Sequence, residues 1–323
     1  MQDTIIPHKL EIDDTIGIIS PSKAPRDNEF NKERTYTATK FINNLGLKVK
    51  FAKHWEDRDF FGGAKFEDRI QDIHDMFLDK DVKMIIMSVG GHYSNSVIPH
   101  LDYKIIRNNP KIFSGFSDGT LLTNAIYKNS GIQTYYGLNF NDTLGFEISE
   151  ATKQNFINTF MSDTPYSITE NYNLTFIDWS NGEKLNKPYN GWNIIKPGIA
   201  KGKLTGGLMA RLITTDYAGF NIDYNNKIMF FESVAELKKL FIELTSMEQK
   251  GVFKQINGLI VGHCTKIEDP KEVADMVSLI LKNYNFPIIQ IGELGHNVEN
   301  YSFPIGAMAE LDTNNKIIKI QRS

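Results

Sequence analysis

The chain has 323 residues, a length that suits two domains or one large α/β unit. Hydrophobic residues make up 41% and charged residues 23%, which are the values of an ordinary globular protein and exclude a disordered or membrane-embedded chain. Thirty-six basic and 39 acidic side chains give a net charge of -3, so no excess positive charge is available to bind nucleic acid.

The cysteine content and the hydrophobic runs indicate the cellular compartment in which the protein works. Cys264 is the only cysteine, so no intramolecular disulfide can form, and a reducing compartment is expected. Residues 1–8 lack the basic head and long apolar stretch of a signal peptide. No run of residues is long and apolar enough to span a bilayer. These features predict a cytoplasmic protein with no membrane partner.

Strand-like and helix-like segments alternate through the first half of the chain. Short β-rich runs are each followed by a segment with helical patterning. The alternation predicts a mostly parallel sheet covered by helices on both sides, with ligands bound at the carboxyl ends of the strands. The segments are, in chain order, strand 15–20, helix 27–45, strand 47–52, helix 65–77, strand 82–89, a helix entering near Ser94, strand 111–113 and helix 119–128.

A looser stretch separates this half from a second unit. Residues 162–197 are dominated by Asn, Asp, Tyr, Trp and Pro, and long segments without periodicity are often functional loops. We expect an N-terminal α/β domain at 1–165, a connecting loop at 166–197 and a C-terminal α/β domain at 198–323. The C-terminal domain is predicted to contain strands 227–231, 258–262 and 287–291, helices 234–250 and 271–281, and a hairpin over 307–320.

The strand-to-helix turn Gly115-Phe-Ser-Asp-Gly119 has the pattern G-x-S-x-G. In this pattern a sharp turn holds the serine hydroxyl out of its strand, beside a base and near amide N–H groups that receive an oxyanion. Ser117 is therefore the candidate nucleophile. Five-residue matches also arise by chance, so an ordinary glycine-rich turn is the alternative.

A serine nucleophile needs a histidine base and a carboxylate that orients it. Of the seven histidines, His296 follows a strand among glycines and is the first choice, with His92 second. Glu232 ends the most apolar strand of the second half, where a buried carboxylate needs a partner such as an imidazole. Its alternative role is that of an acidic residue at a helix N-terminus. An oxyanion hole could combine the N–H of Asp118 with one from Gly90-Gly91.

Several ordered blocks of the sequence resemble one known family. Gly90–Asn95, Ile98–Tyr103 and Asn109–Asp118 are similar to segments of the LD-carboxypeptidase family of serine peptidases. The similarity covers nearly the whole chain, and together the ordered blocks are more specific than the serine turn alone. Further blocks lie at 14–22, 66–69, 135–137, 202–207, 231–232, 251–253 and 303–306.

The resemblance implies both a fold and a site. It implies an N-terminal flavodoxin-like domain with a parallel sheet, a C-terminal α/β domain of LD-carboxypeptidase type, an active site between them and commonly a homodimer. It also implies a triad of Ser117, Glu232 and His296, oxyanion donors at Gly91 and Asp118, and no metal or other cofactor.

Several positions look more like the MccF-like branch of microcin C immunity proteins than like the peptidoglycan-recycling branch. The expected substrate-binding residues are Gly90, Ser94 and Asn95. In that branch an aromatic residue of the connecting segment stacks on the nucleotide base of the substrate, and Trp179 or Trp192 would do so here. One departure bears on substrate recognition: Leu208 follows the double glycine where the family usually has an asparagine.

The predicted reaction is amide hydrolysis through an acyl-enzyme. The MccF-like substrate would be an aminoacyl-nucleotide with an acidic amino acid, and the alternative is the L,D peptide bond of a muramoyltetrapeptide in peptidoglycan recycling. An α/β-hydrolase-like esterase also fits the motif and the chain order Ser, acid, His. A binding module that has lost the chemistry is a further alternative. A metal hydrolase is disfavoured because no H-E-x-x-H or comparable ligand spacing occurs.

Overall fold

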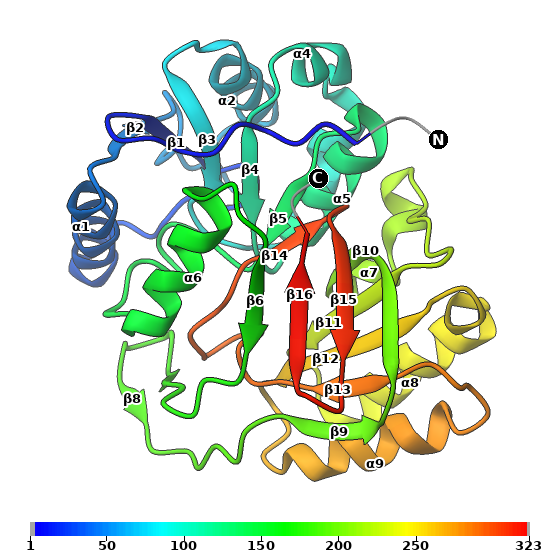
Figure 1. Cartoon of the computed structure of the whole chain (residues 1–323). Coiled ribbons are helices and arrows are strands. Elements are labelled where there is room, and N and C mark those ends of the chain that lie inside the picture. Colours follow the sequence, from blue (N-terminus) through cyan, green and yellow to red (C-terminus); the bar gives the residue numbers. More distant parts are fainter. Residues whose placement is uncertain (1–3, 322–323) are drawn as a thin grey trace.

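Two large sheets, each flanked by helices, form the protein (Figure 1). The computed structural model describes residues 4–321. The strands of the first sheet are, in spatial order, β14 (Phe303–Ile305), β5 (Thr134–Tyr136), β4 (Ile112–Gly115), β3 (Val82–Met87), β1 (Thr15–Ile19) and β2 (Lys48–Phe51). All of them are parallel except β14, which pairs antiparallel with β5. The predicted parallel sheet of the first half is therefore confirmed.

Each face of the first sheet has its own helices. On β3, Met84 and Ile86 pack in one cluster with side chains of α1 (Glu29–Asn44) and α6 (Glu150–Phe160). Ile85 and Met87 point to the opposite face and pack with α2 (Phe66–Leu78) and α5 (Gly119–Ser130). Successive side chains of a strand alternate between faces, so helices on both sides bury the whole strand. Three short helices follow β3, namely α3 (Ser94–Val97), η1 (Ile98–His100) and α4 (Tyr103–Asn108).

The second sheet is larger and mixed in direction. Its strands are, in spatial order, β6 (Tyr166–Thr169), β16 (Ile317–Ile320), β15 (Met308–Asp312), β10 (Ile199–Leu208), β11 (Ile228–Ser233), β12 (Gly258–Cys264), β13 (Ile288–Gln290) and β9 (Asn193–Lys196). The central strands β10 to β13 are parallel, and the outer strands pair antiparallel. The helices α8 (Leu237–Gln249) and α9 (Pro270–Ile280) cover one face, and the short helices are α7 (Met209–Leu212), η2 (Thr215–Ala218) and η3 (Val252–Lys254).

We call the first sheet with its helices and turns the first unit, and the second sheet with its helices the second unit. The other face of the second sheet packs against the first unit. Phe230 and Ile260 belong to one buried cluster with Phe116 and Tyr136 from the first unit. The strand β14 strengthens this junction because it comes from the last part of the chain and completes the first sheet beside β5. The junction brings the end of β5 next to the end of β11, where Tyr136 meets Glu232.

The segment predicted as a connecting loop has more structure than expected. It contributes β6 and β9, the two edge strands of the second sheet, and a small ribbon of β7 (Phe176–Ile177) and β8 (Lys184–Leu185). The polar, proline-containing composition of this segment hides such short strands in the sequence. The hairpin predicted over 307–320 is confirmed as β15 and β16.

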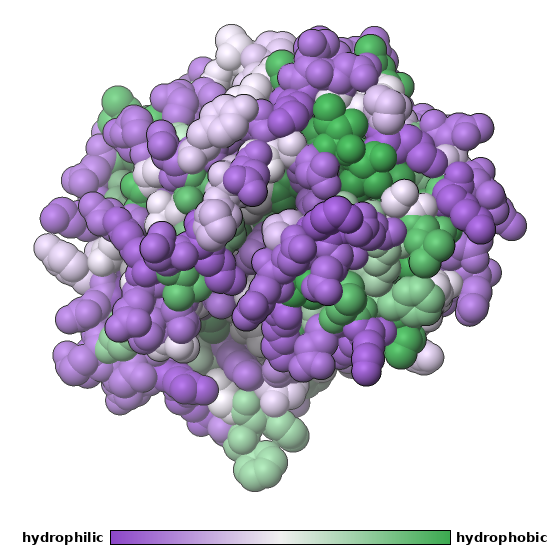
Figure 2. Space-filling model, turned by 90° about the horizontal axis from the view of Figure 1, so that it is seen from below, coloured by the Kyte–Doolittle hydropathy of each residue, from purple (hydrophilic) through white to green (hydrophobic). Residues whose placement is uncertain are grey.

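The lower face of the molecule carries mainly hydrophilic side chains, with hydrophobic ones in separate areas (Figure 2). Among residues 4–321 there is no helix whose length and hydropathy would allow it to cross a membrane.

Candidate active site

Ser117 lies on a tight turn between β4 and α5. Its φ of 60° falls in the left-handed region, which is uncommon for a residue with a side chain and recurs at functional sites. The flanking glycines make the turn possible, because a Cβ at Gly115 or Gly119 would approach the Met87 sulfur to 2.7 or 2.9 Å. The sharp strand-to-helix turn expected from the motif is therefore present.

Three residues that are far apart in the chain meet at this turn. The Ser117 hydroxyl oxygen is 3.0 Å from His296 Nε2, and His296 Nδ1 is 2.9 Å from Glu232 Oε2. The Glu232 carboxylate is completely buried at the end of β11, whereas the His296 side chain is 18% exposed. A hydroxyl, an imidazole and a carboxylate in this order can take a proton from the serine and stabilise the imidazolium that results.

Tyr136, which the sequence did not predict as a site residue, connects Glu232 to the turn that carries Ser117. Its hydroxyl donates to Glu232 Oε1 at 2.8 Å and accepts from the backbone N–H of Ser117 at 3.2 Å. Burial raises the pKa of Tyr136 well above its usual range, and the nearby Glu232 carboxylate raises it further, so the hydroxyl keeps its proton. Tyr136 lies in the block 135–137 that resembles the family, but this resemblance gave no role to its hydroxyl, and its strand beside β4 was not predicted.

Two backbone amides near Ser117 have no hydrogen-bond partner within residues 4–321. Within the described residues 4–321, no acceptor is bonded to the N–H of Gly91 or to that of Asp118. The Gly90 N–H donates to Asp142 Oδ2 at 2.9 Å and is therefore occupied. Gly91 has a φ of 150°, and a Cβ there would lie 2.3 Å from Ser22 Oγ, so only glycine fits at this position.

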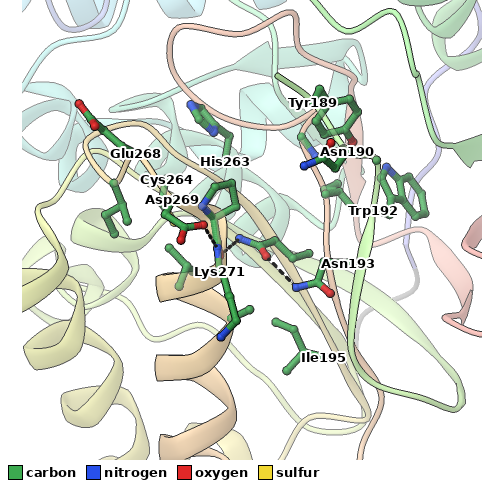
Figure 3. A pocket seen from close by; sticks show the side chains of 18 of the residues that line it. Tyr189, Asn190, Trp192, Asn193, Ile195, His263, Cys264, Glu268, Asp269 and Lys271 are labelled. Carbon is green, nitrogen blue, oxygen red and sulfur yellow. Dashed lines mark hydrogen bonds between the residues drawn. The ribbon is translucent and has the colours of Figure 1, made fainter. Parts of the chain in front are cut away.

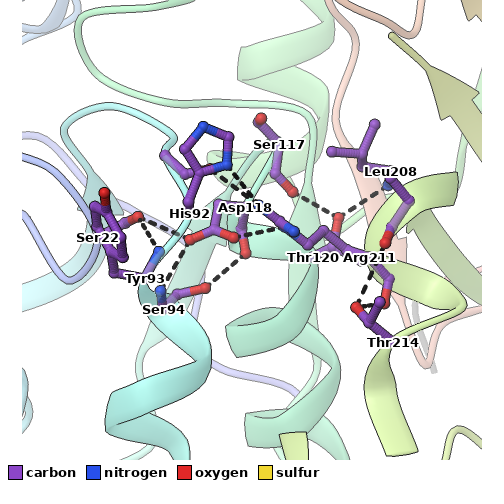
Figure 4. Close-up of polar contacts among 12 residues, drawn as sticks. Ser22, His92, Tyr93, Ser94, Ser117, Asp118, Thr120, Leu208, Arg211 and Thr214 are labelled. Carbon is purple, nitrogen blue, oxygen red and sulfur yellow. Dashed lines mark hydrogen bonds and ion pairs between the residues drawn. The ribbon is translucent and has the colours of Figure 1, made fainter. Parts of the chain in front are cut away.

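The Asp118 side chain is the centre of a buried polar network (Figure 4). Its Oδ2 accepts from Ser22 Oγ at 2.7 Å and from the Ser94 N–H at 2.9 Å, and the Ser94 hydroxyl donates to the Asp118 carbonyl at 2.9 Å. Ser94 is therefore buried, and both its N–H and its hydroxyl help to hold the turn that carries Ser117. Asn95 is exposed on α3. His92, the second candidate for the base, instead contacts Arg211.

The two tryptophans of the connecting segment have different environments. The Trp179 ring lies 5.4 Å from the His296 ring and 5.6 Å from the Phe116 ring, measured between centroids, which places it beside the Ser117 turn. Trp192 is only 2% exposed, and its indole N–H donates to Glu293 Oε2 at 2.6 Å. The structure thus uses Trp192 to pack the connecting segment, which corrects the expectation that it could stack on a substrate base.

A separate cavity of about 1040 Å³ lies between residues 187–195, the ends of β12 and β13, and the start of α9 (Figure 3). Ser117, Glu232 and His296 are not among its lining residues. His263 lines it, and burial lowers the pKa of His263 to about 4, so its imidazole is neutral. Burial raises the pKa of the adjacent Cys264 thiol, which disfavours a reactive thiolate. No group of three or more His, Cys, Asp or Glu residues suited to a metal ion occurs within 4–321.

Comparison with known proteins agrees with this architecture. Residues 16–137 match the model of the LD-carboxypeptidase N-terminal domain, and residues 201–311 match that of the LD-carboxypeptidase C-terminal domain. A putative carboxypeptidase of Treponema pallidum (strain Nichols) is 30% identical, over 99% of this chain and 97% of its own length. The parallel sheet, the second α/β unit and these matches define the class of protein, namely a two-domain α/β peptidase. The chain belongs to the LD-carboxypeptidase family.

Other relatives represent two kinds of activity. A probable murein peptide carboxypeptidase of Bacillus subtilis (strain 168) is 27% identical, over 98% of this chain and 94% of its own. The microcin C7 self-immunity protein MccF of Escherichia coli is 26% identical, over 96% and 94% of the two chains. The crystal structure of an MccF-like protein from Bacillus anthracis str. Ames superposes with a TM-score of 0.90 at 30% identity, covering 98% of this chain and 99% of that one. MccF itself has been solved in complex with glutamyl sulfamoyl guanosine, and it shares the fold with a TM-score of 0.84 at 24% identity, covering 98% of each chain.

Proposed function

We propose that the protein is a serine amidase in which Ser117 is the nucleophile, His296 the general base and acid, and Glu232 the residue that orients His296. The contact of Ser117 with His296, and of His296 with Glu232, is the observation that carries the proposal. Triad geometry of this kind is recognised by the roles of its members and not by sequence position.

The reaction follows from these contacts. The Ser117 oxygen attacks the amide carbonyl while His296 Nε2 takes its proton, and Glu232 holds the opposite imidazole nitrogen. The carbonyl oxygen becomes an oxyanion that accepts hydrogen bonds from the N–H groups of Gly91 and Asp118. His296 then gives its proton to the leaving nitrogen as the amide bond breaks. A water molecule, deprotonated by His296, attacks the acyl ester. The bond to the Ser117 oxygen breaks, the acyl group leaves as a carboxylic acid, and His296 returns the proton to Ser117.

The Ser117→Ala variant tests the nucleophile. We expect turnover to fall by about 10⁴-fold or more, because the variant has no atom to form the acyl-enzyme. The measurement is hydrolysis by the purified variant and by the wild-type protein, with thermal unfolding as the check that both are folded. Unchanged hydrolysis by the variant would refute the assignment.

We further propose an aminoacyl-nucleotide amide as the substrate, as in the microcin C resistance type of reaction. Trp179 supports this choice because its ring lies beside His296 and is partly exposed, as a base-stacking residue must be. The murein peptide carboxypeptidase of Bacillus subtilis supports the second candidate, cleavage of an L,D peptide bond in a muramoyltetrapeptide. An esterase of the α/β-hydrolase type is the third, and ester turnover without amide turnover would favour it.

The Trp179→Ala variant distinguishes the first two substrates. Stacking of a base on an aromatic ring contributes about 1–3 kcal/mol, so KM for an aminoacyl sulfamoyl-adenosine should rise by roughly 5- to 150-fold. The KM for a muramoyltetrapeptide should change little. Parallel turnover of both compounds by the wild-type protein and by this variant is the measurement. Trp192→Phe, which keeps a buried aromatic ring, is the matched control.

We also infer that the protein acts in the cytoplasm, because its single cysteine fits a reducing compartment, and, from the family resemblance, that it is a homodimer. Light scattering on the purified protein measures the mass of the particle, and the mass of a single chain would contradict the dimer.

A further inference from the structure

Arg211 reaches from the second unit to the loops around the nucleophile (Figure 4). It lies on α7, directly after β10, and its Nε is 2.7 Å from Asp118 Oδ1. Its Nη2 is 3.3 Å from the Gly91 carbonyl oxygen and 2.9 Å from His92 Nδ1. One guanidinium group thus touches the two residues whose N–H groups face the substrate in the proposed reaction.

The start of α7 is itself fixed to the nucleophile turn. The N–H of Leu208 donates to Thr120 Oγ1 at 2.9 Å, and the same hydroxyl donates to the Ser117 carbonyl at 2.7 Å. Asn124 adds a second bond across this junction, from its Nδ2 to the Gly206 carbonyl at 3.0 Å. These bonds hold α7 in place, so the position of Arg211 is defined by the same turn that it contacts.

The charge of Arg211 balances a buried charge. The Asp118 carboxylate is completely buried, and its Oδ1 and the Nε of Arg211 have no hydrogen-bond partner among residues 4–321 apart from their mutual ion pair. The other carboxylate oxygen is satisfied by Ser22 and Ser94. Removing one partner of such a pair leaves an uncompensated buried charge. The resulting loss of folding free energy is larger than the stabilisation that the pair itself contributes.

The loop opposite Asp118 needs an external restraint. Gly90 and Gly91 have no side chains to pack, and glycine loses more conformational freedom than any other residue when it is ordered. The bond from Arg211 to the Gly91 carbonyl restrains this loop directly. The bonds of Ser22 and Ser94 to Asp118 restrain it from the other end, at Tyr93 and Ser94.

We propose that Arg211 is a positioning residue that holds the N–H groups of Gly91 and Asp118 in the geometry required to bind the oxyanion. This inference rests on the proposed function, since it assigns Arg211 to the support of that reaction. The second unit would then supply Glu232, His296 and also Arg211, whose contacts shape the oxyanion hole of the first unit.

The test compares Arg211→Met with Arg107→Met. Arg107 is a matched control because it is a partly buried arginine on α4 that donates to a backbone carbonyl, that of Ser130, away from Ser117. Loss of one oxyanion donor costs about 10²- to 10³-fold in kcat, so displacing the donors should lower kcat of Arg211→Met by at least about tenfold with little change in KM. The rate of Ser117 labelling by a fluorophosphonate should fall in parallel, and Arg107→Met should retain both rates.

Amide hydrogen exchange provides a readout that does not depend on catalysis. Exchange at Tyr93 and Ser94 should become faster in Arg211→Met and stay unchanged in Arg107→Met, because only the first variant releases the network around Asp118. Unchanged exchange at these amides, an unchanged kcat, a rise in KM alone, or equal losses in both variants would each overturn the inference. Absence of turnover in the wild-type protein would instead overturn the proposed function, and the exchange experiment would still decide the role of Arg211.

Discussion

At the scale of single residues, Tyr136 determines how Glu232 is held. A carboxylate that is fully removed from water must be paired and hydrogen-bonded, and Glu232 obtains this from His296 on one oxygen and Tyr136 on the other. The same hydroxyl accepts the N–H of Ser117, so this amide is not free to bind an oxyanion. Tyr136 therefore links the orientation of the Glu232 carboxylate to the shape of the Ser117 turn.

Tyr136→Phe should lower kcat by about tenfold or more and leave KM nearly unchanged. The variant loses a hydrogen bond to a charged group, an interaction that contributes about 1.5–3 kcal/mol, while the ring still fills its site. Steady-state kinetics on the preferred substrate provide the measurement. Tyr135→Phe is the control, because Tyr135 lies on the same strand and is bonded to Gln133. Equal kcat values for the two variants would contradict the coupling.

Not all of these residues could be predicted from the sequence, and the reason is physical. The Ser117 turn has a local signature because its glycines must lie within two residues of the serine. The positions of Glu232 and His296 at strand ends, together with the family resemblance, indicate their roles. Tyr136 and Arg211 have no local signature, because each acts through a contact that exists only after two units pack together.

At the scale of elements, the loop that carries His296 rests on β12. A Cβ at Gly295 would lie 2.7 Å from His263 Cβ, and the Thr265 hydroxyl donates to the His296 carbonyl at 2.8 Å. His263 is neutral in this position because burial lowers its pKa to about 4. The stability of the contact between the His296 loop and β12 should consequently depend on pH.

The sign of the pH dependence follows from proton binding. Between the ordinary pKa of histidine, 6.5, and about 4, the unfolded chain binds a proton at His263 that the folded protein does not bind. Acidification from pH 7 to pH 4.5 should therefore lower the free energy of unfolding, with a contribution from this residue of up to about 1.4 kcal/mol per pH unit. Denaturant titrations of the wild-type protein and of His263→Gln measure it. If the free energy of unfolding depends on pH in the same way in both proteins, His263 is not the group responsible. The control is His8→Gln, which changes an exposed histidine.

The strands and helices also show which elements can be predicted from sequence patterns alone. Strands β1 to β4 and helices α1, α2 and α5 of the first unit were expected from the alternation of strand-like and helix-like segments. Strands β5 and β14 of the first sheet and the edge strands β6 and β9 of the second were not, since each is recognisable only by its pairing. The boundaries 165 and 198 remain proposals, since β6 and β9 tie the connecting segment to the second sheet.

At the scale of the whole molecule, β14 joins the two units. It follows the second unit in the chain, pairs with β5 in the first sheet, and leads back into β15. Phe303 also belongs to the buried cluster that holds Phe116, Phe230 and Tyr136. Neither unit can separate from the other without losing this strand and this cluster.

We expect the protein to unfold in a single cooperative transition, although it has two sheets. Calorimetry should give equal calorimetric and van't Hoff enthalpies. Ile305→Ala, which truncates a completely buried side chain of β14, should lower the midpoint of the whole transition, with a cost of about 2–5 kcal/mol. Two resolved transitions, or a shift in only one part of the curve, would contradict this expectation. Truncation of exposed Ile12 is the control.

The late position of β14 in the chain also affects how the protein is made. A ribosome releases the first unit before residues 303–305 have been polymerised, so β5 lacks its outer neighbour until the second unit has been translated. Glu232 and His296 emerge in the same interval. The nascent polypeptide therefore carries Ser117 without Glu232 and His296 until the second unit follows it, and under the proposed mechanism hydrolysis cannot begin before that point.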